Sequence, residues 1–213
     1  MKQNICYTNA ALVAAATPVP RLALARDESP SRKMDPKMEE MMKKAEAAAT
    51  PGAAHKALDP LVGNWTAEVK CWMAPEGQIT VTKATAKSTW VINGRFVQQE
   101  FSGEFMGKPF RGIGFTGYDN VRQKYNSVWM DDMSTTMFTS EGVADPDGKV
   151  LTFEGDYACA MTGEKHKVFR QIYRILGPDK HVFEMHDPTK GDNSKTLEIT
   201  YTRAETSLTR TRE

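Results

Sequence analysis

From residue 63 onward, apolar and polar residues alternate along the chain. The first stretch alternates with a period of two, and its apolar set is Trp65, Ala67, Val69, Cys71 and Met73. This period is typical of a β-strand with one buried face. Strand-like segments of the same kind follow at 78–92, 95–105, 109–118, 124–132, 135–143, 150–161, 166–176, 181–187 and 195–203.

Turn residues separate these segments, and no helical pattern lies between them. Asn93-Gly94 and Met106-Gly107-Lys108 are hairpin signals. Short links between consecutive strands predict an antiparallel meander, and closing the sheet removes its two exposed edges. We therefore predict an all-β, antiparallel up-and-down (lipocalin-like) barrel of about nine to ten strands with an N-terminal helix. Glycines at 112, 114 and 117 are expected to let one strand bend at a barrel corner.

The N-terminal helix is predicted over residues 34–50. Asp35 can cap it, Pro36 suits its first turn, and Pro51-Gly52 ends it. Its apolar stripe has helical spacing and consists of Met34, Met38, Met41, Met42 and Ala45. We expect this helix to lie over one end of the barrel or to be tethered loosely to it.

Residues 1–33 have the outline of a secretory signal. Lys2 precedes an alanine-rich run, and Ala23-Leu24-Ala25 offers a cleavage site that would start the mature chain near Arg26. This predicts a periplasmic or secreted protein. The alternatives are a disordered leader, or a cytoplasmic protein whose true start is Met34. The predicted organisation is a leader (1–33), helix and linker (34–52), barrel (53–204) and disordered tail (205–213).

Charge and composition exclude some classes of partner. The 28 basic and 27 acidic side chains nearly balance, so no strong field attracts nucleic acid or an anionic membrane. No stretch approaches the roughly 20 apolar residues that span a bilayer, which predicts a soluble body with no membrane partner. Cys71 and Cys159 are either buried thiols or, in an oxidising compartment, a disulfide.

Alternation also predicts which side chains face the barrel interior. The inward set on the later strands is Leu151, Phe153, Tyr157, Cys159, Met161, His181, Phe183, Met185, Leu197, Ile199 and Tyr201. Polar or polarisable groups among apolar ones suit a pocket for a small, largely apolar molecule, although a filled core gives the same pattern. The candidate ligand-binding residues are Tyr157, His181, Met185 and Tyr201 inside, with Trp129 and Arg95 at the rim.

Catalytic candidates are few. They are His181, His55 and Asp131, the last in a loop expected at the barrel rim near His55 and the Asn93-Gly94-Arg95 hairpin. No metal site is expected, because His181 and His186 lie five residues apart and so face opposite sides of a strand. No cofactor is predicted; a haem with His181 as axial ligand is the alternative considered.

The chain resembles a known family. The matching pieces are Leu58-x-x-Leu61-x-Gly63-x-Trp65, Asn93-Gly94-Arg95-Phe96, Gly117-Tyr118-Asp119-Asn120, Trp129-x-Asp131-x-Met133-Ser134-Thr135 and Glu198-Ile-Thr-Tyr-Thr-Arg203. In this order they resemble the bacterial domain-of-unknown-function family 1579 (DUF1579) over about residues 34–203. The resemblance implies a lipocalin-like, calycin-type barrel and no particular activity.

Three hypotheses follow for function. The first is a protein that binds a small apolar molecule inside the barrel. The second is an enzyme of isomerase, hydratase or hydrolase type on the same barrel, with Asp131 and either His181 or His55 as its pair. The third is an interaction protein with a filled core.

Overall fold

The computed structural model describes residues 34–72 and 79–205. Its helical segments are α1 (Pro36–Ala49), α2 (Ala53–Lys56), η1 (Asp59–Leu61) and η2 (Pro188–Asn193). Its strands are β1 (Gly63–Cys71), β2 (Thr80–Val91), β3 (Phe96–Phe105), β4 (Lys108–Asp119), β5 (Lys124–Asp131), β6 (Phe138–Ala144), β7 (Val150–Tyr157), β8 (Lys167–Gly177), β9 (Lys180–His186) and β10 (Lys195–Arg203).

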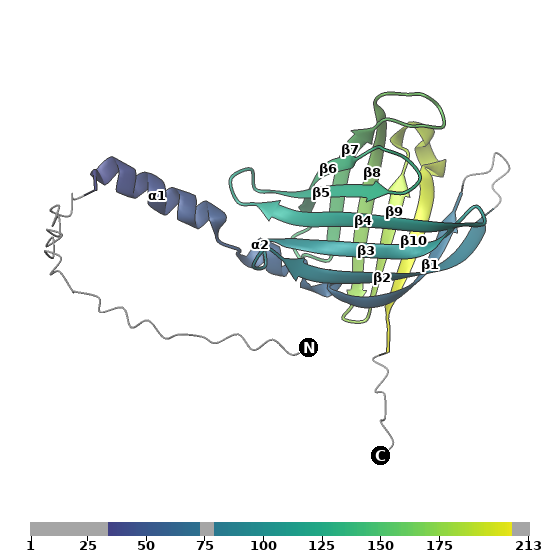
Figure 1. Ribbon diagram of the computed structural model, residues 1–213, viewed down its shortest axis with the longest axis horizontal. Helices are drawn as coiled ribbons and strands as arrows, with labels where there is room; N and C mark the ends of the chain where they lie inside the picture. Colours follow the sequence, from purple (N-terminus) through teal and green to yellow (C-terminus); the bar gives the residue numbers. More distant parts are fainter. Residues whose placement is uncertain (1–33, 73–78, 206–213) are drawn as a thin grey trace, which may run out of the picture.

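The ten strands form one closed antiparallel barrel, which confirms the predicted fold. Each strand pairs with its neighbours in sequence, and β10 pairs with β1 to close the ring (Figure 1). The closing register runs from Trp65 opposite Arg203 to Cys71 opposite Leu197. The side chain of Arg203 reinforces this seam, because its guanidinium lies 4.3 Å from the Trp65 ring centroid and donates to the carbonyl of Val62 at 3.2 Å.

Two hairpins form at the turn signals in the sequence. The first is a four-residue loop between Val91 and Phe96, in which Ile92, Asn93 and Gly94 take φ values of 49°, 53° and 76°. The second is a two-residue turn, in which Met106 and Gly107 take φ values of 51° and 77°, and its twist matches the flanking strands. Glycine adopts a positive φ at little steric cost. These turns set the register of β2 with β3 and of β3 with β4.

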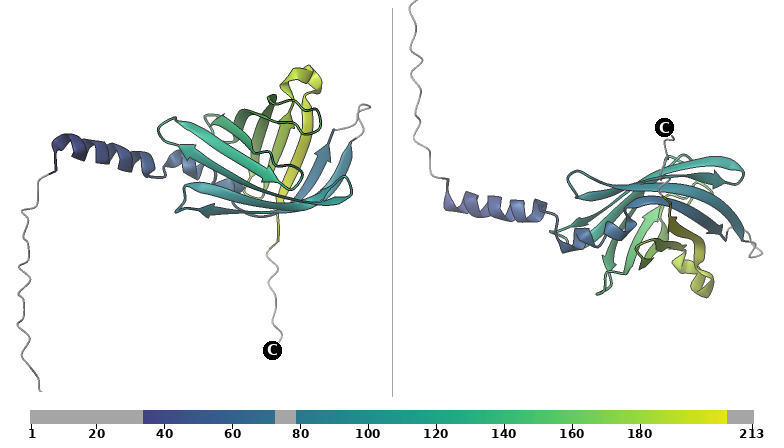
Figure 2. Two further views of the ribbon diagram at one scale, coloured as in Figure 1. Left: turned by 45° about the horizontal axis from the view of Figure 1, so that its top comes forward. Right: turned by 90° about the horizontal axis from the view of Figure 1, so that it is seen from below.

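Helix α1 begins and ends as predicted and points away from the barrel. The Asp35 carboxylate accepts from the backbone N–H of Lys37 at 2.8 Å, and Pro36 occupies the first turn. The amide of Asn120 holds the other end by donating to the carbonyls of Ala48 (2.9 Å) and Thr50 (2.8 Å). The helix projects beyond the barrel in all three views of Figures 1 and 2. In the part of the chain that the structure describes, no helix is long and apolar enough to cross a membrane.

One end of the barrel is closed by the short segment that contains α2 and η1. Leu58 is fully buried and Leu61 is 6% exposed, and both pack against Val97, Leu151 and Phe153. The indole of Trp65 donates to the Leu61 carbonyl at 3.0 Å, which fixes this segment to β1. We call this the closed end.

Two details differ from the sequence predictions. Met161 is exposed, because β7 ends at Tyr157 and the N–H of Gly163 donates to the Cys159 carbonyl in a turn. At Gly112 and Gly114, a Cβ would collide with the Trp129 indole, so these glycines make room for a ring.

The predicted cleavage site at Ala23–Ala25, the inward position of Met73 and most of the tail lie outside the described residues.

Candidate functional site

The opposite end of the barrel has no comparable cover among the described residues. Loops 132–137, 158–166 and 187–194 surround it, and we call it the open end. The interior between the two ends is the lumen. Residues near the middle and the open end therefore define the candidate site.

Several lumen side chains keep accessible surface although they point inward. The strand registers place Val69, Trp129, Tyr173, Met185 and Leu197 on the inner face, and all five are only partly buried. A closed sheet shields its inner face from outside, so exposed surface on these residues belongs to space inside the barrel or at its mouth.

A belt of neutral polar side chains crosses the middle of the lumen. Three pairs make it: Ser88 with Gln99 (3.4 Å), Thr116 with Ser127 (3.4 Å) and Ser140 with Gln171 (3.2 Å). Burial raises the pKa of Tyr201 and of Tyr173, so both hydroxyls stay protonated at neutral pH. The belt offers donors and acceptors and no formal charge.

Aromatic rings line the lumen between this belt and the open end. Phe138 stacks on Tyr157 at a centroid distance of 4.5 Å, and Phe101 meets Trp129 edge-on at 6.3 Å. The Trp129 indole donates to the Asp131 carboxylate at 3.0 Å, which anchors the ring at the rim. Burial is the main cause that raises the pKa of Tyr157 to about 12, and the contact with Cys159 is the second.

His181 lies deeper and belongs to the packed part of the core. Its ring is 1% exposed, stacks on Tyr201 and meets Trp65 edge-on at 4.5 Å. Neither ring nitrogen has a hydrogen-bond partner among the described residues. A haem iron needs an open side at one nitrogen, and the surrounding side chains leave none.

The structure separates the residues that the sequence grouped into a rim site. His55 accepts from the Gly52 N–H and packs edge-on against Tyr118, at the closed end. Burial lowers the pKa of His55. The charge of Arg95, in the hairpin beside His55, lowers this pKa further. Asp131 ends β5 at the open end. It lies about 20 Å along the strand from Tyr125, which packs in the same cluster as Leu58 and Leu61 at the closed end. Asp131 is therefore paired with neither His55 nor His181.

Cys159 and Cys71 are separate buried thiols. Cys159 lies at the open end and lines a hollow of about 410 Å³ between loops 133–136 and 158–165. Hydrogen bonds from the Thr162 side chain, and from the backbone N–H groups of Thr162 and Met161, lower the pKa of Cys159 to about 7. Burial raises the pKa of Cys71.

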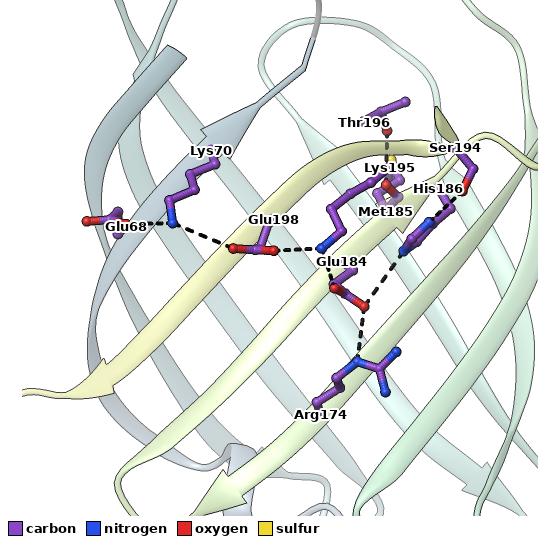
Figure 3. A network of polar contacts seen from close by, with 10 residues as sticks. All are labelled: Glu68, Lys70, Arg174, Glu184, Met185, His186, Ser194, Lys195, Thr196 and Glu198. Atoms are coloured by element: carbon purple, nitrogen blue, oxygen red, sulfur yellow. Dashed lines mark hydrogen bonds and ion pairs between the residues drawn. The ribbon is translucent and has the colours of Figure 1, made fainter. Parts of the chain in front are cut away.

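An ion-pair network on the outer face holds the loop between β9 and β10. Glu184 is 8% exposed and accepts from Lys195 (2.6 Å) and Arg174 (3.1 Å), with His186 at 3.7 Å (Figure 3). His186 also contacts Ser194 at 2.9 Å, which joins the two ends of the loop. Burial alone would raise the pKa of Glu184, but Lys195 and Arg174 outweigh it and lower that pKa.

Comparison with known proteins places the chain in a family. The family described as "Protein of unknown function (DUF1579)" matches residues 50–203. The chain belongs to the DUF1579 family. No curated protein sequence matches this DUF1579 protein.

Solved structures share its barrel at low identity. Rv2717c from M. tuberculosis is 18% identical with a TM-score of 0.56, and the match covers 73% of this chain and all of that one. The S-type phycobiliprotein lyase CPES from Guillardia theta is 9% identical with a TM-score of 0.48, over 73% of this chain and 94% of that one. The first likeness supports the fold of the DUF1579 protein.

The polar belt is the part of the site that the sequence analysis missed. Gln99, Ser140 and Gln171 fall on the inward phase of their strands, next to Phe101, Gly142 and Phe169. The sequence signal for the belt is a polar residue at an inward position of a strand whose other inward residues are apolar.

Proposed function

We propose that this DUF1579 protein binds a small, largely apolar molecule in its lumen, entering through the open end. The accessible surface on inward side chains, from Val69 to Leu197, carries the proposal. Aromatic rings would cover the apolar body of the ligand, and the belt would meet a neutral polar group. This is the arrangement usual for small-molecule pockets, which are mostly apolar with a few placed polar groups.

The observations favour binding over the other two hypotheses. An enzyme built on a histidine–aspartate pair needs the two groups to converge, and Asp131 lies far from both His55 and His181. Accessible surface on Trp129, Tyr173 and Met185 favours a lumen that is not completely filled.

A fluorescent apolar probe, N-phenyl-1-naphthylamine, tests the proposal. Leu197→Trp places a larger ring in the lumen and is expected to weaken probe binding at least about ten-fold. Thr202→Trp is the matched control, because Thr202 lies on the outer face of the same strand and is exposed. If the wild type does not bind the probe, or both variants bind it equally, lumen binding is wrong. Native mass spectrometry of protein from its own host would show whether a small molecule copurifies.

A further inference from the structure

In the described strands, charged residues in inward positions lie only at the strand ends. The registers place Lys108, Asp131 and Lys167 at the open end and Arg203 at the closed end. Lys167 stands four residues, about 13 Å, from the belt residue Gln171 along β8. The belt in the middle of the lumen is therefore lined by uncharged side chains, as far as the structure describes the chain.

An ionised ligand group would find no counter-ion at the belt. His181 adds no charge at neutral pH, because burial lowers its pKa to about 4. Lys167 already lies 3.8 Å from the carboxylate of Asp187 and 3.7 Å from that of Glu164. A charged group held at the belt would lose its hydration without gaining an opposite charge. That loss is far more costly than burying an alcohol or an amide that finds a hydrogen-bond partner.

The amide of Gln171 has one half engaged and one half open. Ser140 donates to its Oε1 atom at 3.2 Å, and no described residue accepts from its Nε2 atom. Among the described residues, the fully enclosed nitrogens that lack a partner belong to His181 and His186, so Gln171 Nε2 is not fully enclosed. Gln171 is 5% exposed and sits on the inner face of β8, so this nitrogen borders the lumen. Its two N–H groups call for an acceptor, because a buried donor without one costs stability.

Given lumen binding as proposed above, on which this inference rests, we infer that the ligand ends in an uncharged alcohol or amide group. The oxygen of this group accepts from the Gln171 amide, and the apolar body extends from there toward the open end. The stretch of β8 from Gln171 to Lys167 limits the enclosed part of that body to about 13 Å, close to the length of an extended decyl chain. The rings of Phe138, Tyr157 and Phe169 pack together over this stretch.

Displacement of N-phenyl-1-naphthylamine from the full chain at pH 8 tests the charge of the ligand. 1-Decanol and decanoate have chains of the same length, and at this pH the first is neutral and the second is ionised. We expect 1-decanol to displace the bound probe at a concentration at least about ten-fold lower than decanoate. If decanoate displaces the probe equally well, or if neither compound displaces it, the inference is wrong although lumen binding stands.

Gln171→Leu separates hydrogen bonding from simple hydrophobicity. A site that is merely apolar would bind 1-decanol more tightly after this change, whereas the loss of a hydrogen bond should weaken 1-decanol binding about five-fold. Binding of the naphthylamine probe should change little, which reports an intact barrel. Gln98→Leu is the matched control, because it makes the same substitution on the outer face of β3, where Gln98 bonds to Glu100. This control should bind both compounds as the wild type does.

The outcomes distinguish a failure of the inference from a failure of lumen binding. A wild type that does not bind the probe would remove lumen binding itself. A wild type that binds it, together with a Gln171→Leu protein that binds 1-decanol as tightly or more tightly, would remove only the alcohol or amide group. Gln171→Met keeps the length of the side chain and repeats the test if Gln171→Leu does not fold, and the comparison of 1-decanol with decanoate needs no variant.

Discussion

The imidazole of His181 stacks on the phenol of Tyr201 at a centroid distance of 4.4 Å, in a place where neither imidazole nitrogen finds a hydrogen-bond partner among the described residues. Burial and, secondarily, the charge of Arg203 lower the pKa of His181 from 6.5 to about 4. Between pH 6.5 and 4 the imidazole of His181 therefore stays neutral in the folded protein, whereas it takes up a proton in the unfolded chain.

The first prediction is a loss of stability in acid that depends on His181. Between pH 6.5 and 4 the unfolded chain binds more protons than the folded one, so the free energy of unfolding falls as pH falls. The contribution is complete above pH 6.5, and a shift of this size corresponds to about 3 kcal/mol lost once the pH is below 4. His181→Phe keeps the stacking and removes the proton, so its urea midpoint should change less between pH 7 and 4 than that of the wild type.

The matched control for this prediction is His166→Gln. His166 is 85% exposed and pairs with Asp156 at the surface, so its replacement should leave the acid response almost unchanged. Equal pH dependence of stability in the wild type and in His181→Phe would contradict the assignment.

A second prediction concerns Gly112 and the ring that lies over it. A Cβ at this position would overlap the Trp129 indole, whose N–H bonds to Asp131. Gly112→Ala should push the ring toward the lumen, destabilise the fold by about 1–3 kcal/mol and shift the tryptophan fluorescence. Gly177→Ala is the control, because a Cβ there meets no other atom within 4 Å and its φ is not positive. A stability loss of the same size in both variants would remove the steric explanation.

The barrel was predictable because its inward and outward faces differ in polarity along every strand. Nearly all strand limits fall within about three residues of the predicted ones. The exception is β7, which was extended to residue 161 because the alternation continues through Cys159 and Met161. The alternation of apolar and polar residues does not reveal where a hydrogen-bonded turn replaces strand pairing.

The candidate site was less predictable, because it depends on how far each residue lies along the barrel axis and not only on whether its side chain points inward. Alternation places His181, Met185 and Tyr157 on one inner face without saying that His181 lies in packed core and Tyr157 near the open end. The cover at the closed end was also missed, since the four residues of α2 are too few to show a helical period. Leu58 and Leu61 were noticed only as part of a family motif.

A third prediction tests the network around Glu184. Glu184→Gln leaves Lys195 and Arg174 without their shared carboxylate in a site that is 8% exposed, so we expect a loss of about 2 kcal/mol in the free energy of unfolding. Faster hydrogen exchange in the 187–194 loop should accompany it. Glu154→Gln breaks a comparable but exposed pair with Arg170 and is expected to cost less than about 1 kcal/mol. Similar losses in the two variants would show that burial adds nothing at Glu184.

A fourth prediction compares the two thiols of the barrel. The thiolate is the reactive form of cysteine, and the hydrogen bonds that reach Cys159 lower its pKa to about 7, whereas burial raises that of Cys71. Iodoacetamide at pH 7.5 should therefore alkylate Cys159 at least about ten-fold faster, with a rate that rises through pH 7; peptide mass spectrometry assigns each thiol. Thr162→Val removes the hydroxyl that does most to lower this pKa and should move the pH profile upward, while Thr66→Val, on the outer face of β1, should not. If Cys159 reacts no faster than Cys71, its hydrogen bonds do not stabilise the thiolate, and the turn at 159–163 serves only to end β7.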